Sequence, residues 1–355
     1  MAPLDWGLGH ATRCIPIVRS LQENGHEVVL AADGSVAALL SSEFPRIEIK
    51  TLKGYGIRYS KNASLVGTML QQLPGIMQSI KGEQQWLVDL LKNENFDLII
   101  SDNRPGFYSR QVPSVYITHQ LLIHSGKGKW LNKLLQQLHN RYIKNFHTVW
   151  VPDLEGSVNL AGELAYPGKQ LVKPVYLGLI SRMEAIKTDA KYDLMIMLSG
   201  PEPQRTILEE KLTADISSYK GKVLLVRGLP TAANVDLQLP PHITTHNHLP
   251  ASLLQEAICS SQLIICRSGY TTLMDLIRLN KKAVLIPTPG QPEQEYLADY
   301  MQQQHFFPFV KQENITLQKA TLVAENFQYK NPFTDDDFER YKEIINKQVE
   351  ILSIG

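Results

Sequence analysis

The chain has 355 residues, of which 43% are hydrophobic and 20% are charged, a composition typical of a soluble globular protein and unlike that of a disordered or fibrous one. This length exceeds what one hydrophobic core usually serves, so we expect two domains. Lys and Arg number 36 against 35 Asp and Glu, which excludes an overall positive field that would attract nucleic acid.

The cysteines and the hydropathy pattern indicate the cellular compartment of the protein. Cys14, Cys259 and Cys266 are far apart and show no C-x-x-C spacing, which argues against a disulfide framework or a structural zinc site. No stretch approaches the roughly 20 apolar residues of a membrane span, and no charged-then-apolar signal sequence begins the chain. We therefore expect a cytoplasmic protein.

Short β-branched runs alternate with helix-length segments along the whole chain. In the first half the runs cover 27–31, 47–52, 96–101, 114–118 and 148–151. In the second half they cover 193–198, 222–227, 243–245, 262–266 and 283–287. Such runs, bounded by turn residues, predict buried strands of parallel sheets with crossover helices. The pattern predicts an α/β protein with two Rossmann-like, doubly wound domains facing across a cleft.

The predicted domains cover residues 1–178 and 192–355, with a linker at 179–191. A last helix is expected at about 334–353. Thr334 and the three acids that follow it supply an N-cap and negative charge for the first turn, which explains this acidic run better than a metal site does. This helix can pack back on the N-terminal domain.

The first glycine-rich turn, LDWGLGHATR at 4–13, follows an expected short strand and opens a helix. Gly9 can present backbone N–H groups to an anion there. His10 lies within the turn, and imidazole exchanges protons near neutral pH, so His10 is a candidate base; a loop-bracing role is the alternative. Because Asp33 stands where a dinucleotide-binding acid belongs, a dehydrogenase also remains open, although Thr12 replaces the third small residue of that fingerprint.

The second turn, CRSGYTT at 266–272, again links a strand to a helix. Its N–H groups and Arg267 suit a diphosphate, although an ordinary turn of an α/β unit has the same pattern. Two further loops leave strand ends, at 199–205 and 287–295, where ligands of open α/β sheets bind. Their amides and carboxylates suit sugar hydroxyls. These loops add Gly200, Glu202, Gln204, Arg205, Gln291, Gln294 and Glu295 to the candidate donor-binding residues.

At this point the chain resembles the GT-B glycosyltransferases, in particular family 28, which includes the N-acetylglucosaminyltransferase that makes lipid II. The resemblance covers nearly the whole chain and is most specific in CRSGYTT with PGQPEQEYLA, and in GLGHATR near the start. It implies a nucleotide-sugar donor, in most cases a UDP-sugar, bound mainly by the C-terminal domain. The acceptor is then expected at the N-terminal domain.

The resemblance also implies roles for single residues. The diphosphate turn of the family is matched by Ser268, Gly269, Tyr270 and Thr271. Asp275 matches the acid that binds the ribose, and Leu249 matches the position whose backbone contacts the base. The sugar-binding positions are matched by Gln294 and Glu295. His10 is the expected base, with Asp102 and His119 as alternates. Inversion at the anomeric carbon follows by analogy. We expect no metal and no cofactor, because Arg267, Arg205 and the helix N-terminus at Gly269 can stabilise the departing diphosphate.

Two other functions stay open at this point. A nucleotide-sugar epimerase shares the architecture and would act without an acceptor, and a non-catalytic sugar-nucleotide-binding protein would tolerate loss of His10. His242, His246 and His248 fit a strand end and its loop better than a metal site. The acceptor is undetermined among a glycan, a lipid-linked molecule and a small molecule.

A basic amphipathic segment follows at 127–147, with Lys127, Lys129, Lys133, Arg141 and Lys144 and no acid. It can lie on an anionic membrane surface, which would make the protein peripheral at the inner face of the membrane. An ordinary crossover helix with its apolar face in the core is the equally weighted alternative.

Overall fold

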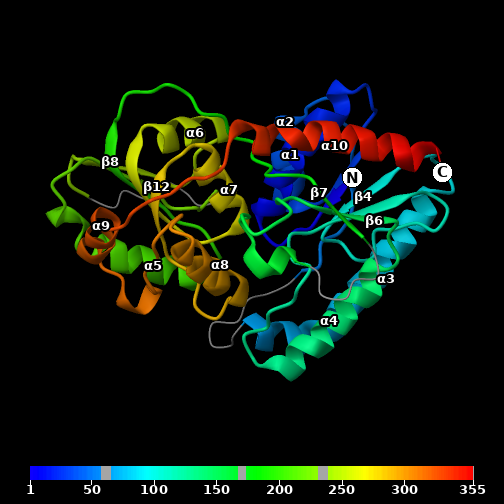
Figure 1. Ribbon diagram of the computed structural model, residues 1–355, viewed down its shortest axis with the longest axis horizontal. Helices are drawn as coiled ribbons and strands as arrows, with labels where there is room; N and C mark the ends of the chain where they lie inside the picture. Colours follow the sequence, from blue (N-terminus) through cyan, green and yellow to red (C-terminus); the bar gives the residue numbers. More distant parts are fainter. Residues whose placement is uncertain (57–64, 167–172, 231–238, 355) are drawn as a thin grey trace. The chain divides into compact units, whose positions relative to one another are not determined.

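The structure is a computed structural model, and it describes residues 1–56, 65–166, 173–230 and 239–354 (Figure 1). The chain forms two compact units. Of the described residues, unit 1 holds 1–56, the stretch from Val66 to Arg182 and the C-terminal segment from Thr334, whereas unit 2 holds Met183 to Phe333.

Unit 1 is a parallel α/β sheet. Its strands are β1 (Ala2–Pro3), β2 (Leu30–Ala32), β3 (Ile49–Thr51), β4 (Ile99–Asp102), β5 (Ser114–Ile117), β6 (Thr148–Val151) and β7 (Pro174–Tyr176). Five of them pair in the order β1-β4-β5-β6-β7, and β2 pairs with β3. The Ala31 N–H donates to the Met1 carbonyl at 2.9 Å and so joins the two sheets. The combined order is doubly wound, with β1 as the strand where the winding reverses.

The helices of unit 1 follow the expected crossovers. They are α1 (Leu8–Glu23), α2 (Gly34–Glu43), α3 (Leu65–Leu90) and α4 (Lys129–Ile143). Most buried residues of α1 are apolar, and some of them pack with β2 and α2 in one cluster that includes Ile15, Val18, Leu30 and Leu40. This burial is what positions the first turn of α1, where His10 lies, against the sheet.

Unit 2 repeats the same winding. Its strands are β8 (Tyr192–Met197), β9 (Val223–Val226), β10 (Ile243–His246), β11 (Ser261–Cys266) and β12 (Lys282–Leu285), all parallel in the order β10-β9-β8-β11-β12. The reversal falls between β8 and β11. The helices are α5 (Gln204–Thr213), α6 (Ala251–Cys259), α7 (Tyr270–Arg278), α8 (Pro292–Gln303) and α9 (Leu317–Glu325). Both units are therefore Rossmann-like, which confirms the predicted fold class.

Strand β7 is the clearest difference from the sequence-based expectation, which placed no strand there. It begins at Pro174, which has no N–H to donate, and it lies at the sheet edge beside β6. An edge strand needs hydrogen bonds on one side only, so the proline is tolerated. Strand β2 also begins later than expected, at Leu30.

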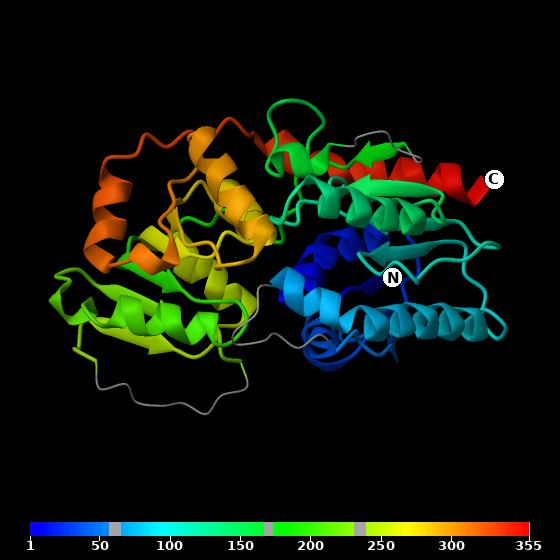
Figure 2. The same cartoon turned by 90° about the horizontal axis from the view of Figure 1, so that it is seen from below.

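The last helix, α10 (Asp335–Ile354), returns to unit 1 and packs on α1 (Figure 1; Figure 2). Its first turn carries three aspartates, and the Asp337 carboxylate accepts from the Thr334 N–H at 2.9 Å and from its hydroxyl at 3.0 Å. Gly178 has φ +93°, and a Cβ there would lie 2.8 Å from the Asp337 carbonyl, so only glycine fits. The chain is thus fixed closely against the start of α10.

Among the described residues, none of the helices is both long enough and apolar enough to span a bilayer.

Burial predicts which residues attach α10 to unit 1. Ile345 is fully buried, whereas Ile351 on the same helix is 55% exposed. We expect Ile345→Ala to lower the free energy of unfolding by about 2–5 kcal/mol, because it leaves a cavity. The matched variant Ile351→Ala should change it by about 0.5 kcal/mol or less. Urea titration followed by circular dichroism measures both, and equal losses would contradict the packing described for α10.

Candidate active site

The candidate residues of unit 1 lie at the carboxyl ends of the strands beside the reversal point. Strand β1 ends at Pro3, which is in register with Asp102 at the end of β4. The loop after β1 leads directly into α1, so the first turn of α1 and Asp102 lie at the same edge of the sheet. Ligands of open α/β sheets bind at this edge.

Asp102 is the centre of a buried polar cluster. Its carboxylate is fully buried and forms an ion pair with the guanidinium of Arg13, which is also buried. His10 Nδ1 lies 3.3 Å from Asp102 Oδ1 and 2.9 Å from an Arg13 amino nitrogen. His119, from the loop after β5, has its Nδ1 3.1 Å from the other Arg13 amino nitrogen. The structure therefore brings together all three predicted catalytic residues.

The charges of this cluster are balanced within it. Burial alone would raise the pKa of Asp102, but the nearby Arg13 and His10 outweigh it and lower this pKa to about 2. Cys14, whose thiol lies 3.4 Å from Asp102 Oδ2, has a pKa raised well above its usual value by burial first and by the Asp102 charge second. Asp102 is therefore an anion and Cys14 a neutral thiol at neutral pH.

The two neighbours of His10 favour different tautomers. Arg13 has only donors, so a bond from Arg13 to His10 requires an unprotonated Nδ1. An ionised Asp102 has only acceptors, so a bond to Asp102 requires the proton on Nδ1, which leaves the lone pair on Nε2. Only the second tautomer makes Nε2 a base. His119 Nδ1 accepts from Arg13, which leaves the proton of the neutral ring on Nε2.

Arg13 was not among the candidate site residues, although it now connects all the others. Its only sequence signal is its spacing, three residues after His10 on a helix, which places both side chains on the same face. Asn103, directly after Asp102, has φ +57°, a conformation that Asn adopts more readily than most residues. It turns the chain away from the sheet immediately after the carboxylate.

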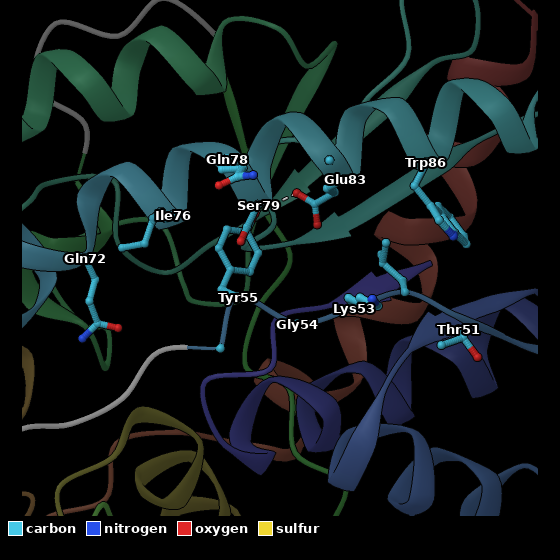
Figure 3. Close-up of a pocket in the computed structure, with 14 residues that line it drawn as sticks. Thr51, Lys53, Gly54, Tyr55, Gln72, Ile76, Gln78, Ser79, Glu83 and Trp86 are labelled. Carbon is cyan, nitrogen blue, oxygen red and sulfur yellow. Dashed lines mark hydrogen bonds between the residues drawn. The ribbon is translucent and has the colours of Figure 1, made fainter.

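A cavity of about 690 Å³ opens in unit 1 between the loop after β3 and helix α3 (Figure 3). Its walls include the aromatic and aliphatic side chains of Tyr55, Ile76 and Trp86, together with Gln72 and Gln78. This volume and this mainly apolar lining with a few polar groups are typical of a small-molecule pocket.

A second buried ion pair supports the wall of this cavity. Glu83 of α3 is paired with Arg104 and accepts from the Tyr55 hydroxyl at 2.7 Å (Figure 3). Burial raises the pKa of Tyr55, so it stays a neutral donor. Arg104 also donates to the Pro3 carbonyl at 3.2 Å. The cavity wall is therefore tied to the strand ends that carry the Asp102 cluster, and Glu83 is a residue that the sequence analysis missed.

In unit 2, Arg267 connects three of the predicted loops. It is 1% exposed, and its amino nitrogens donate to the carbonyls of Gln204 at 2.8 Å, Ile286 at 3.1 Å and Pro287 at 3.3 Å. Burial lowers the pKa of Arg267 to about 10, so it remains a cation at neutral pH. Its described hydrogen bonds all go to backbone carbonyls rather than to carboxylates.

Gly200 lies beside two polar atoms of this region, one of them on Arg267. Arg267 Nε and Thr288 Oγ1 are buried and have no hydrogen-bond partner among the described residues. A Cβ built on Gly200 would lie 3.7 Å from Thr288 Oγ1 and 3.8 Å from Arg267 Nε. Gly200 has φ +101°, which favours glycine, and its missing side chain leaves the position next to both atoms unfilled. An anion is the group that these two donors would bind.

Several predicted donor-binding residues stabilise the loops themselves. The Ser268 hydroxyl donates to the Gln294 carbonyl at 2.8 Å, and Gln294 Oε1 accepts from the Thr288 N–H at 2.9 Å. Glu295 Oε1 accepts from the Gly290 N–H at 2.8 Å. Gln291 is the N-cap of α8. In this state Ser268 and the side-chain oxygens of Gln294 and Glu295 therefore hold the turns in place.

Arg205 is similarly engaged with carboxylates. Its Nε donates to Glu202 at 2.5 Å, and an amino nitrogen donates to Glu209 at 2.6 Å. Glu209 is also paired with Arg227, which donates to Asn247 Oδ1 at 3.0 Å. This network joins the loop after β8 to the loop after β10, where Leu249 is buried. Arg205 thus supports the loops, and its charge is already matched.

The remaining candidates surround the start of α7. Gly269 is its N-cap in an extended conformation, and the nearest atom to a Cβ there would be Thr272 Oγ1 at 4.0 Å. Tyr270 and Thr271 form the first turn, and Asp275 lies one turn further on. Of the predicted donor-binding residues, Gly9 lies in unit 1, in the first turn of α1, whereas the others lie in unit 2.

The histidines near β10 do not gather into a metal centre. His246 and His248 are exposed on either side of a buried Asn247, which lies in the loop after the strand. Within the described ranges, no group of three or more His, Cys, Asp or Glu side chains could hold a metal ion.

Comparison with known proteins identifies the class. Spinosyn rhamnosyltransferase SpnG complexed with thymidine diphosphate is similar with a TM-score of 0.61 and 14% identity, over 99% of this chain and 97% of that one. Glycosyltransferase VinC in complex with dTDP gives 0.58 and 15%, over 99% and 95%. MurG from Acinetobacter baumannii gives 0.54 and 13%, over 100% and 98%. A search of curated proteins finds no match.

The fold is thus that of the GT-B glycosyltransferases, two Rossmann-like units in one chain. Residues 223–345 match the glycosyltransferase family 28 C-terminal domain. The chain is a GT-B glycosyltransferase with a family 28 C-terminal domain, as the sequence motifs indicated.

The buried Arg13–Asp102 pair makes stability depend on pH. The folded pKa of Asp102 is lowered from 3.8 to about 2, so its contribution is complete above pH 4 and is lost as the pH falls from about 4 to about 2. We expect Asp102→Asn to destabilise the protein by about 3–5 kcal/mol at pH 7, because Arg13 stays buried without a partner. The difference from the unmodified protein should shrink by about 1–2 kcal/mol between pH 7 and pH 2.5.

Urea titrations in steps between neutral pH and pH 2.5 measure this difference, with Asp97→Asn as the control at an exposed position. A difference between Asp102→Asn and the unmodified protein that is independent of pH would show that Asp102 is not held as a buried anion.

Proposed function

We propose that this glycosyltransferase moves a sugar from a UDP-sugar to an acceptor hydroxyl, with inversion and without a metal ion or cofactor. Unit 2 binds the donor and unit 1 binds the acceptor. The single observation that carries the proposal is the pair of loops at the carboxyl ends of β8 and β11: the buried cation Arg267 lies beside Gly200 of the first loop, and helix α7 begins directly after the second. The cytoplasmic location expected from the sequence stays a prediction.

The donor half of the proposal rests on charge. Arg267 is held as a cation among carbonyl groups, and its Nε lies beside Gly200 together with the Thr288 hydroxyl. The first N–H groups of α7 add the positive end of a helix dipole at Gly269. These groups suit a diphosphate both before and after the sugar leaves, which is why we propose that no metal ion is needed. Uracil as the base rests on the family resemblance, and dTDP is the alternative to test.

The acceptor half rests on the Asp102 cluster. With its Nδ1 proton directed to Asp102, His10 accepts the proton of the acceptor hydroxyl at Nε2. The hydroxyl oxygen then forms a bond to the anomeric carbon, and the bond from that carbon to the diphosphate oxygen breaks. Attack from the face opposite the leaving group inverts the anomeric centre. Asp102 stabilises the imidazolium, and Arg13 keeps Asp102 ionised.

The cavity between the loop after β3 and α3 is the proposed acceptor pocket. Its polar wall, formed by Tyr55, Glu83 and Arg104, is fixed to Pro3 and so to the strand edge of the Asp102 cluster. The mainly apolar lining suits an acceptor that is not a bare sugar.

Nucleotide binding tests the donor site. We would titrate the protein with UDP, GDP and dTDP by calorimetry, with and without magnesium. UDP should bind best and equally well in both conditions. Gly269→Asp should lower UDP affinity by about 100-fold or more, because a carboxylate replaces open space at the helix N-terminus.

Gly269→Asn is the matched control, since Asn fills the same space without charge and is an equally good N-cap. We expect a loss of roughly tenfold or less with Asn, since only charge repulsion separates the two variants. Absence of binding for all three nucleotides would refute the donor site, and stronger binding of dTDP than UDP would correct the base.

His10 tests the acceptor half. The assay measures the UDP that is released from a UDP-sugar in the presence of a mixture of acceptors that carry hydroxyl groups. We expect His10→Ala to slow this release by about 10²–10⁴-fold, because the group that accepts the proton is lost. Its UDP affinity by calorimetry should be unchanged. A variant that transfers sugar as fast as the unmodified protein would exclude His10 as the base.

A further inference from the structure

The outward face of α4 carries apolar and basic side chains together. Trp130 is 78% exposed and Leu134 is 47% exposed. Lys133, Arg141 and Lys144 are also exposed, and their spacing along the helix places them on the same side as Trp130. We refer to these five residues as the Trp130 face.

The opposite side of α4 packs within unit 1. Leu131, Leu135 and Leu138 are partly buried, and Ile143 is buried. Tyr142 packs against a cluster that includes residues of α3. The crossover helix expected from the sequence therefore has its inward apolar stripe, and Trp130 and Leu134 lie outside that stripe. Packing within unit 1 does not account for a tryptophan that is mostly in solvent.

The lysines at the start of the helix do not stabilise it. Lys127, Lys129 and Lys133 lie at or near its N-terminus, and no acidic residue is in its first turn. The helix dipole favours negative charge at that end, so these lysines oppose it. No ion pair within the described part of the chain involves any of the five basic residues of 127–147. Because the whole chain has a net charge of only +1, the remainder is acidic on balance, and positive charge is concentrated on this segment.

Side-chain hydrogen bonds attach α4 firmly to the loop before it. Asn132 Oδ1 accepts from the Ser125 N–H at 2.8 Å. Gln136 Oε1 accepts from the Ile123 N–H at 2.8 Å, and Gln136 Nε2 donates to the Leu121 carbonyl at 2.9 Å. This loop continues directly from His119. The Trp130 face is thus presented by a rigid element that is connected to the Asp102 cluster.

We propose that the Trp130 face docks unit 1 on an anionic lipid bilayer. Trp and Leu enter the boundary between headgroups and acyl chains, where the amphipathic indole ring is favoured. The lysine and arginine side chains reach the anionic headgroups around them. Charge complementarity selects an anionic surface, and the exposed apolar pair selects a bilayer over a nucleic acid. This docking is separate from sugar transfer and does not depend on the proposed function.

The test is cosedimentation of the full chain with vesicles of phosphatidylcholine alone and of phosphatidylcholine mixed with phosphatidylglycerol. We expect binding to the anionic vesicles only, and weaker binding at higher salt. The double variant Lys133→Gln/Arg141→Gln should bind the anionic vesicles roughly tenfold more weakly, because each positive charge near an anionic surface raises the binding affinity severalfold. Trp130→Ala should also bind roughly tenfold more weakly, because the indole no longer enters the interface.

Matched control variants test whether a loss of vesicle binding is specific to the Trp130 face. Lys319→Gln/Lys347→Gln removes two exposed charges elsewhere, and Leu322→Ala shortens a side chain that is 57% exposed. Both should bind vesicles as the unmodified protein does. Calorimetry with UDP on every variant shows whether unit 2 is intact, so a failure of docking is distinguished from a failure of the donor site.

Three results would overturn the proposal. They are equal binding to neutral and anionic vesicles, unchanged binding of both Trp130-face variants, and a preference for a DNA duplex over anionic vesicles.

Discussion

A carboxylate buried without solvent must be matched by a cation, and in unit 1 this constraint fixes the site. Asp102 is fully buried at the end of β4, and Arg13 on α1 neutralises it. The pair locks the first turn of α1 onto the sheet, and with it the loop that follows β1. His10 and His119 are then placed by their contacts to the same guanidinium. The geometry of the Asp102 cluster is thus a consequence of charge balance in the interior.

In unit 2, the strand ends carry a buried cation that has no carboxylate among its described hydrogen-bond partners. Arg267 is as deeply buried as Arg13, yet its described hydrogen bonds go to carbonyl groups, which satisfy its geometry but not its full charge. A site of this kind is electrostatically incomplete until an anion arrives. The two units share one winding and differ in the partners of the buried cation, which are a carboxylate for Arg13 and carbonyl groups for Arg267.

The sequence predicted the layers well and the side-chain network poorly. Buried parallel strands are continuous apolar runs, so β6 and the core strands of unit 2 were found within a residue or two of their ends. Strand β7 was missed because its proline and short length resemble a linker. The strand-end loops were predicted because glycine and polar residues concentrate there. Arg13 and Glu83 lie on helices, where a single charged residue looks like an exposed one, and only tertiary packing shows that each is buried with a partner. The same limit concealed that Arg205, Ser268 and Glu295 support loops.

The return of α10 to unit 1 has a consequence for the order in which the protein matures. Most of unit 1 precedes unit 2 in the chain, but the helix that covers α1 is made after unit 2. Its buried side chains, Phe338, Tyr341, Ile345 and Val349, become available only after unit 2 has been made. Until then, the face of α1 that they cover is exposed to solvent and to other chains. All the strands of unit 2 lie between Met183 and Phe333, so they are made before α10. Unit 1 is therefore started before unit 2 and finished after it, and a nascent chain that stalls before residue 334 has an Asp102 cluster whose helix α1 lacks the cover of α10.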